Sequence, residues 1–160
     1  MIREKINFDQ HSLEQFWAEA LTYDQSMRDL KFVKDHLGFY RDLTVRVLAI
    51  APTVRIRINR SQYAFYDDLD IGPFCSFAFF KSKFALNPMR LKSENVKDLN
   101  CDIFSFEGKT YRMGGTFYAQ FFNWDVNDLN KAAEVAKRSF DVKEKVGPAP
   151  FFGDLKKRGV

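Results

Sequence analysis

The stretch Phe74-Cys-Ser-Phe-Ala-Phe-Phe-Lys-Ser-Lys-Phe84 is the most strand-like part of the chain. Successive side chains of a strand point to opposite faces of a sheet, and apolar side chains fall on both faces here. One face carries, in order, Cys75, Phe77, Phe79, Lys81 and Lys83. We therefore expect residues 74–84 to form one central strand with both faces at least partly covered.

Other segments with the two-residue period of strands lie on either side of this stretch. They span residues 43–49, 54–59, 61–66, 102–106 and 110–122. The last two are expected to form a hairpin, because Gly108 between them supplies the positive φ that a tight turn requires. The pair Gly114-Gly115 predicts a bulge or a close backbone approach within the second strand of that hairpin.

Helical periodicity marks the two ends of the chain. Residues 12–37 carry apolar side chains at helical spacing and are expected to form two helices or one kinked helix, ended by Gly38. Near the other end, Asp125 is expected to cap a helix. Its apolar stripe would be Val126, Leu129, Ala133, Ala136 and Phe140. These elements predict an α+β fold, in which a mostly antiparallel sheet of about five strands is covered by an N-terminal helical pair and a C-terminal helix.

The composition predicts one globular domain. The chain has 160 residues, of which 46% are hydrophobic and 29% are charged, as in ordinary folded proteins. We expect a single domain over residues 1–146 and a basic tail with Pro and Gly over residues 147–160. The 18 Phe residues against 2 Trp and 6 Tyr are expected to be mostly core, with some lining a ligand site or an interface.

No targeting segment or cofactor motif stands out. The charged N-terminus lacks the apolar segment of a signal peptide, and the longest apolar stretch is too short to cross a bilayer. Cys75 and Cys101 belong to no set with metal-ligand spacing and are expected to be unpaired thiols. We therefore expect a cytoplasmic protein that does not enter a membrane, with no cofactor. The sequence leaves the oligomeric state open.

A basic and aromatic sheet face favours a non-catalytic protein that binds nucleic acid. The net charge is +4, and single-stranded nucleic acid is held by cations that contact phosphates and by rings that stack on bases. The residues expected on this face are Arg46, Arg55, Arg57, Lys81, Lys83, Phe77 and Phe79. The same basic residues are also typical of a solvated sheet face or of an edge strand protected by charge.

Three other functions remain open. A protein-interaction module, such as an inhibitor or accessory subunit, would use exposed Phe side chains and the tail residues Phe151, Phe152, Lys156, Lys157 and Arg158. A cavity lined by Phe would make the protein a small apolar-ligand binder or an enzyme. A metal-dependent nuclease would hold Mg²⁺ or Mn²⁺ with Asp67, Asp68 and Asp70 together with Glu107 and Lys109. The last pattern is weak, because Glu107 and Lys109 fall at the expected tip of a hairpin.

Overall fold

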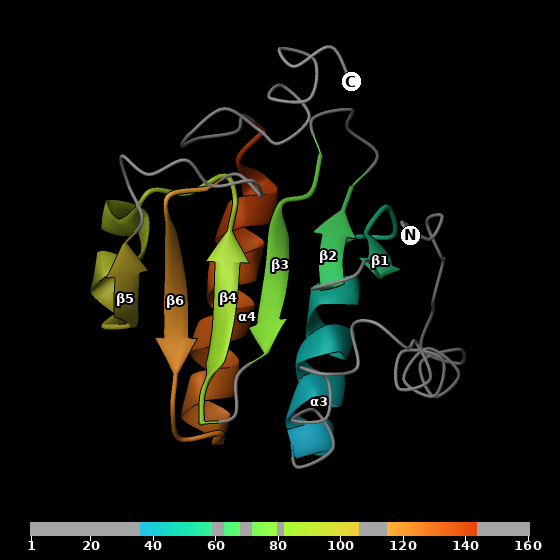
Figure 1. Ribbon diagram of the computed structural model, residues 1–160. Helices are drawn as coiled ribbons and strands as arrows, with labels where there is room; N and C mark the ends of the chain where they lie inside the picture. The colour runs from blue at the N-terminus through green and yellow to red at the C-terminus, as the bar shows by residue number, and fades with distance from the viewer. Residues whose placement is uncertain (1–35, 59–62, 68–71, 80–81, 106–114, 144–160) are drawn as a thin grey trace, which may run out of the picture.

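The computed structural model describes residues 36–58, 63–67, 72–79, 82–105 and 115–143. These ranges hold one antiparallel sheet of six strands in the order β1-β2-β3-β4-β6-β5 (Figure 1). The strands are β1 Arg55–Ile58, β2 Tyr63–Tyr66, β3 Cys75–Phe79, β4 Phe84–Pro88, β5 Asp102–Ser105 and β6 Phe117–Phe121. The helices are α3 Leu37–Leu48, the 3-10 helix η2 Ser93–Leu99 and α4 Val126–Asp141. The α+β class and the antiparallel sheet are therefore confirmed.

Several predictions concern residues outside these ranges. They are the helices within residues 12–35, the turn at Gly108 and the tail at residues 147–160. These stay predictions, as does the domain boundary after residue 146. β5 and β6 are confirmed as antiparallel neighbours, but Ser105 lies opposite Phe117, a register that a tight turn at Gly108 would not give.

The stretch 74–84 forms two strands, so the prediction of one long central strand is wrong. β3 ends at Phe79 and β4 begins at Phe84, and these two residues are paired in the hairpin. Apolar residues recur in both strands, which makes them look like one strand in the sequence, but the core-facing positions change from odd-numbered residues in β3 to even-numbered residues in β4. The polar segment Lys81-Ser82-Lys83 was the signal that the chain reverses there.

The strand expected over residues 43–49 is wrong, because this segment belongs to helix α3. The side chains of Tyr40, Leu43 and Val47 are fully buried, and their spacing places them on one face of a helix. The β-branched residues of this segment, which favoured a strand, fit into the helix. The hydroxyl of one of them, Thr44, donates a hydrogen bond to the Tyr40 carbonyl one helical turn back, at 2.7 Å. Gly38, expected to end a helix, lies in the first turn of α3.

Helix α4 begins where the sequence predicts. The Asp125 carboxylate accepts a hydrogen bond from the Asp128 backbone N–H at 2.8 Å, which is the geometry of an N-cap. The Asp128 carboxylate in turn accepts from the backbone N–H groups of Asn123 and Trp124, and so fixes the turn from β6. The buried stripe differs from the predicted one. Val126 is 67% exposed, and the buried apolar positions are Leu129, Ala132, Val135 and Ala136.

One face of the sheet, which we name the core face, packs against α3 and α4. Both helices lie behind the sheet in Figure 1. The cross-strand register places the same alternating set of residues on this face along the strands. Its buried members include Ile56, Phe65, Cys75, Phe77, Phe84, Leu86, Phe117, Ala119 and Phe121. The free energy of burying these side chains, about 25 cal/mol per Å² of apolar surface, is the main term that holds the layers together.

Gly115 confirms the close approach expected at the Gly-Gly pair, although it precedes β6 and lies outside the strand. Its φ is +81°, and a Cβ atom built on it would lie 2.5 Å from Asn87 Oδ1. Both the backbone angle and the contact disfavour any side chain.

We predict that Gly115→Ala lowers the free energy of unfolding by at least about 1–3 kcal/mol, the usual range for a strained residue in the left-handed region. Gly38→Ala is the control, because Gly38 lies in a helix and a Cβ atom there meets nothing within 4 Å. It should stabilise the protein by about 0.5–1 kcal/mol. Urea denaturation of both variants checks this, and equal effects of the two substitutions would contradict the described backbone.

Candidate functional site

The basic and aromatic residues predicted to share one face are divided by the sheet. Phe77 is fully buried on the core face. Arg55 is paired with Tyr66 and therefore lies on the opposite face, since neighbouring Ile56 points into the core. The prediction that Phe77 and the arginines form a common open surface is therefore wrong. Lys81 and Lys83 each lie an even number of positions after Phe77, so one continuous strand would place all three side chains on the same face. The chain reverses between Phe79 and Phe84 instead, and the prediction did not include that reversal.

The other predicted residues are also separated. Arg46 lies on α3, and its guanidinium donates to Asn130 Oδ1 of α4 at 2.6 Å. Lys83 lies just before β4 and donates to the Gln120 side chain of β6. Arg57 and Phe79 belong to β1 and β3, and their side chains lie outside the described part of the structure. Lys81 and the tail residues Phe151, Phe152, Lys156, Lys157 and Arg158 also lie outside it.

The face opposite the core, which we name the second face, is built of small, polar and tyrosine side chains. The register places on it Arg55, Ala64, Tyr66, Ser76, Ala85, Asn87, Asp102, Phe104, Tyr118 and Gln120. At its centre, Ser76 and Asn87 are at most 1% exposed, whereas Phe104 at the β5 edge is 49% exposed. Solvent therefore reaches the second face mainly at its β5 end.

A line of polar contacts crosses three strands on this face. Lys83 donates to Gln120 Oε1, and Gln120 Nε2 donates to Asp102 Oδ1 at 3.0 Å. A buried amide that bridges a cation and a carboxylate has both of its polar ends satisfied. This line fixes the position of Asp102 on β5 relative to the centre of the sheet.

Strand β5 is the last strand of the sheet in the described part of the chain, and all four of its residues are exposed. Two of them are large and apolar: Ile103 is 36% exposed and Phe104 is 49% exposed. The Phe104 ring lies 6.4 Å from that of Tyr118 on β6. Edge strands usually carry charge or are covered to prevent pairing with other chains, so an exposed apolar edge suggests an interaction site.

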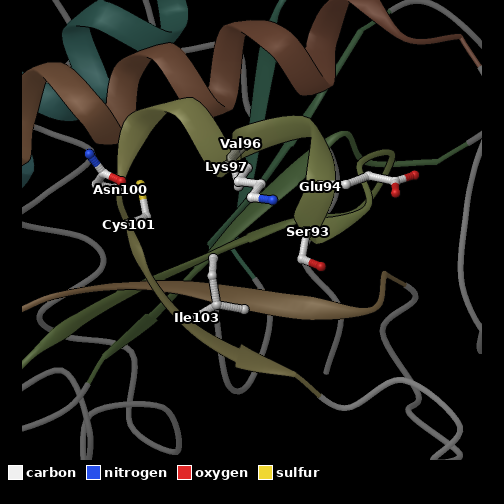
Figure 2. Close-up of a pocket in the computed structure, with 7 residues that line it drawn as sticks. All are labelled: Ser93, Glu94, Val96, Lys97, Asn100, Cys101 and Ile103. Atoms are coloured by element: carbon white, nitrogen blue, oxygen red, sulfur yellow. The ribbon is translucent and has the colours of Figure 1, made fainter.

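A pocket of about 410 Å³ lies between η2 and β5 (Figure 2). Its lining residues are Ser93, Glu94, Val96, Lys97, Asn100, Cys101 and Ile103. In Figure 2 the Ile103 side chain points from β5 towards η2, Lys97 extends above it, and the Glu94 carboxylate points away. Burial raises the pKa of the Cys101 thiol, so this side chain stays neutral and contributes to the apolar part of the wall.

The most constrained polar cluster in the described residues surrounds Arg90. Its guanidinium is fully buried and makes two hydrogen bonds to the Asp67 carboxylate, at 3.0 and 3.1 Å. It also donates to the carbonyl groups of Gly72 and Val142. Asp67, the first residue of the predicted acidic metal loop, is therefore held in an ion pair that joins the end of β2 to the segment after β4, and Arg90 links both to the C-terminal end of α4 through Val142. Asp68, Asp70, Glu107 and Lys109 lie outside the described residues.

The Cys75 thiol, near the Arg90 cluster, is poorly suited to act as a nucleophile. Cys75 is fully buried, and this burial raises its pKa well above the usual range, although the nearby Arg90 charge acts in the opposite direction. Only a thiolate reacts readily as a nucleophile, so Cys75 is expected to be inert. In the described ranges, no three His, Cys, Asp or Glu side chains gather where they could hold a metal ion.

Comparison of the chain with models of protein families, with characterised proteins and with solved structures found no match. Among the helices that the structure describes, none is long and apolar enough to cross a membrane. The candidate site therefore rests on geometry. Sequence reasoning missed Ile103, Phe104 and Tyr118, because alternation within a strand is the same at the edge of a sheet as at its centre.

We predict that Arg90→Met lowers the free energy of unfolding by about 3–5 kcal/mol, because it removes the guanidinium that makes two hydrogen bonds to the buried Asp67 carboxylate. The matched control is Arg138→Met. Arg138 makes a similar two-bond contact with Asp98, but at the surface, where ion pairs contribute little. Chemical denaturation measures both, and a loss at Arg90 no larger than that at Arg138 would contradict this role of the buried pair.

Proposed function

We propose that this protein is a non-catalytic interaction module that binds a protein partner along strand β5. The observation that carries the proposal is the exposure of the whole edge strand, including two large apolar side chains, one on each face of the sheet. Isolated exposed apolar residues are common on soluble proteins. Two on an edge strand are unusual, because the strand also offers backbone hydrogen-bonding groups to another chain.

The geometry favours this function over the others considered. The basic residues expected to bind nucleic acid do not meet Phe77 on one surface, and in the described residues the pocket beside β5 is bordered by a surface strand rather than enclosed by Phe side chains. The exposed Phe side chain that an interaction module requires is present at Phe104. A contribution of the tail at residues 147–160 belongs to the same proposal.

The test compares partner capture by the wild type with capture by Ile103→Lys/Phe104→Thr. The lysine places a charge on the edge, and the threonine removes the ring while keeping a residue that favours strands. We expect the variant to keep the wild-type circular dichroism spectrum and to lose the proteins that the wild type recovers from the cells that produce it.

Val126→Lys is the matched control, because Val126 is also apolar and 67% exposed but begins α4. It should recover the same proteins as the wild type. Identical recovery by the wild type and the β5 variant would reject the proposal. A further truncation before residue 147 measures what the tail adds.

Nucleic-acid binding remains a second candidate, favoured by one observation on the second face. The neighbouring rings of Phe104 and Tyr118 lie on this face, and the half-buried Lys83 contacts Gln120 of the same strand as Tyr118. Rings near cations are what single-stranded nucleic acid requires, with stacking worth about 1–3 kcal/mol per base. The neighbouring Asp102 carboxylate opposes a phosphate, which is why this function ranks second.

For this second candidate, binding of a labelled oligothymidine should weaken steeply as salt is raised, because phosphate contacts release counterions. Lys83→Glu and Phe104→Ala should each weaken the binding measured by fluorescence anisotropy. Lys137→Glu, the same charge change on α4, should have little effect. Absence of binding at low salt, or affinity that ignores salt and both substitutions, would remove nucleic acid as a ligand.

A further inference from the structure

We infer that the β5 edge accepts an extended peptide segment that carries an apolar residue and, two positions away, an acidic residue. This inference rests on the proposed function and names the chemistry of the partner. It follows from three features that lie together: the exposed edge strand, the pocket between β5 and η2, and the charge of the one cation lining that pocket.

The edge strand selects the conformation of the occupant. β5 pairs with β6 on one side only within the described residues, and an edge offers backbone N–H and C=O groups in the spacing of a strand. An added strand satisfies both kinds of group along its length, which a helix or a small molecule does not. The occupant is therefore an extended polypeptide segment.

The pocket selects one apolar side chain. Side chains of an added strand alternate between the two faces, as those of β5 do. The partner side chains that point to the core-face side of the sheet would lie next to Ile103. Ile103 itself points towards η2 and lines the pocket (Figure 2). The buried Val96 and the neutral, half-buried Cys101 complete an apolar wall there. An apolar side chain of the partner would bury the exposed part of Ile103 together with its own surface, because Val96 is already buried.

The positive charge of Lys97 favours an acidic residue close to the partner's apolar residue. Among the residues that line the pocket, Lys97 is the one cation, and it extends over Ile103, whereas the Glu94 carboxylate points away (Figure 2). Because Lys97 lies above Ile103, a partner carboxylate on the same face as the apolar residue is placed to approach it. The next residue on that face is two positions along the strand, about 7 Å away, which the flexible lysine side chain can span.

The test is a selection from a random peptide library displayed on phage, carried out on the full chain and on Ile103→Lys and Val126→Lys. We expect peptides with the apolar–any–acidic pattern to be enriched on the wild type and on Val126→Lys but not on Ile103→Lys. Enrichment that does not depend on Ile103, or no enriched pattern of this kind, overturns the inference.

A selected peptide and a version with lysine in place of its acidic residue then test the role of Lys97. On titration into ¹⁵N-labelled protein, shifts should be confined to β5, η2 and their neighbours. The acidic version should bind about tenfold more weakly to Lys97→Glu than to the wild type, the size of effect that a reversed charge pair produces. Lys137→Glu should leave the affinity unchanged. Equal binding of both peptides to the wild type overturns the acidic requirement.

The outcomes separate this inference from the proposed function. If partner capture depends on β5 but selection gives no apolar–any–acidic pattern, the inference fails and the proposed function stands. If neither capture nor selection depends on β5, both fail. A dimer seen by sedimentation and abolished by Ile103→Lys would assign the edge to a second copy of the chain and overturn the peptide assignment.

Discussion

The fold depends on the packing of one ring, that of Phe84 at the start of β4. Within 6.4 Å of its centroid lie the centroids of five other rings in the described chain: Phe39, Tyr40, Phe77, Phe121 and Trp124. These rings come from α3, β3, β6 and the turn before α4, so one side chain joins both helices to the sheet. Each such ring pair adds about 0.5–1.5 kcal/mol beyond the burial of its surface. The edge-to-face geometry of most of the pairs also restricts how the layers can be placed.

Around this cluster, the sheet closes its aromatic face and leaves the apolar side chains of Ile103 and Phe104 exposed at β5. Aromatic residues at alternate positions of the inner strands are committed to the core face, where α3 and α4 cover them. The second face therefore carries small and polar residues at its centre, and its exposed aromatic side chain, Phe104, lies at the edge. The Arg90–Asp67 pair ties the opposite end of α4 to the loop after β2. These contacts fix the strands relative to the helices, and a strand that is paired on one side offers a preformed surface on the other.

Part of this arrangement could be read from the sequence. Alternation located β1, β2 and the β5–β6 pairing, and Asp125 marked the start of α4, because these signals are local. Two elements were misread for physical reasons. The β-branched residues of α3 favour strands intrinsically, but burial of Tyr40 and Leu43 on one helical stripe outweighs that preference. The chain reversal before Phe84 shifts the phase of the alternation by one residue, since Phe77 and Leu86 face the same side, and a local pattern does not show where such a shift occurs. The candidate site was missed because the place of a strand within a sheet depends on pairing between distant segments, and nothing in Asp102–Ser105 records that β5 lies at an edge.

In the described residues, the aromatic core face is closed to solvent, whereas the apolar side chains of β5 are exposed. A soluble nitroxide added to ¹³C-labelled protein tests this difference directly, because the nitroxide broadens the NMR signals of side chains that it can approach. The account predicts strong broadening of the Ile103 methyl and Phe104 ring signals and little or none for the Phe77 and Phe84 rings. Broadening of the Phe77 ring comparable to that of Phe104 would show that the core face is open and would contradict the account.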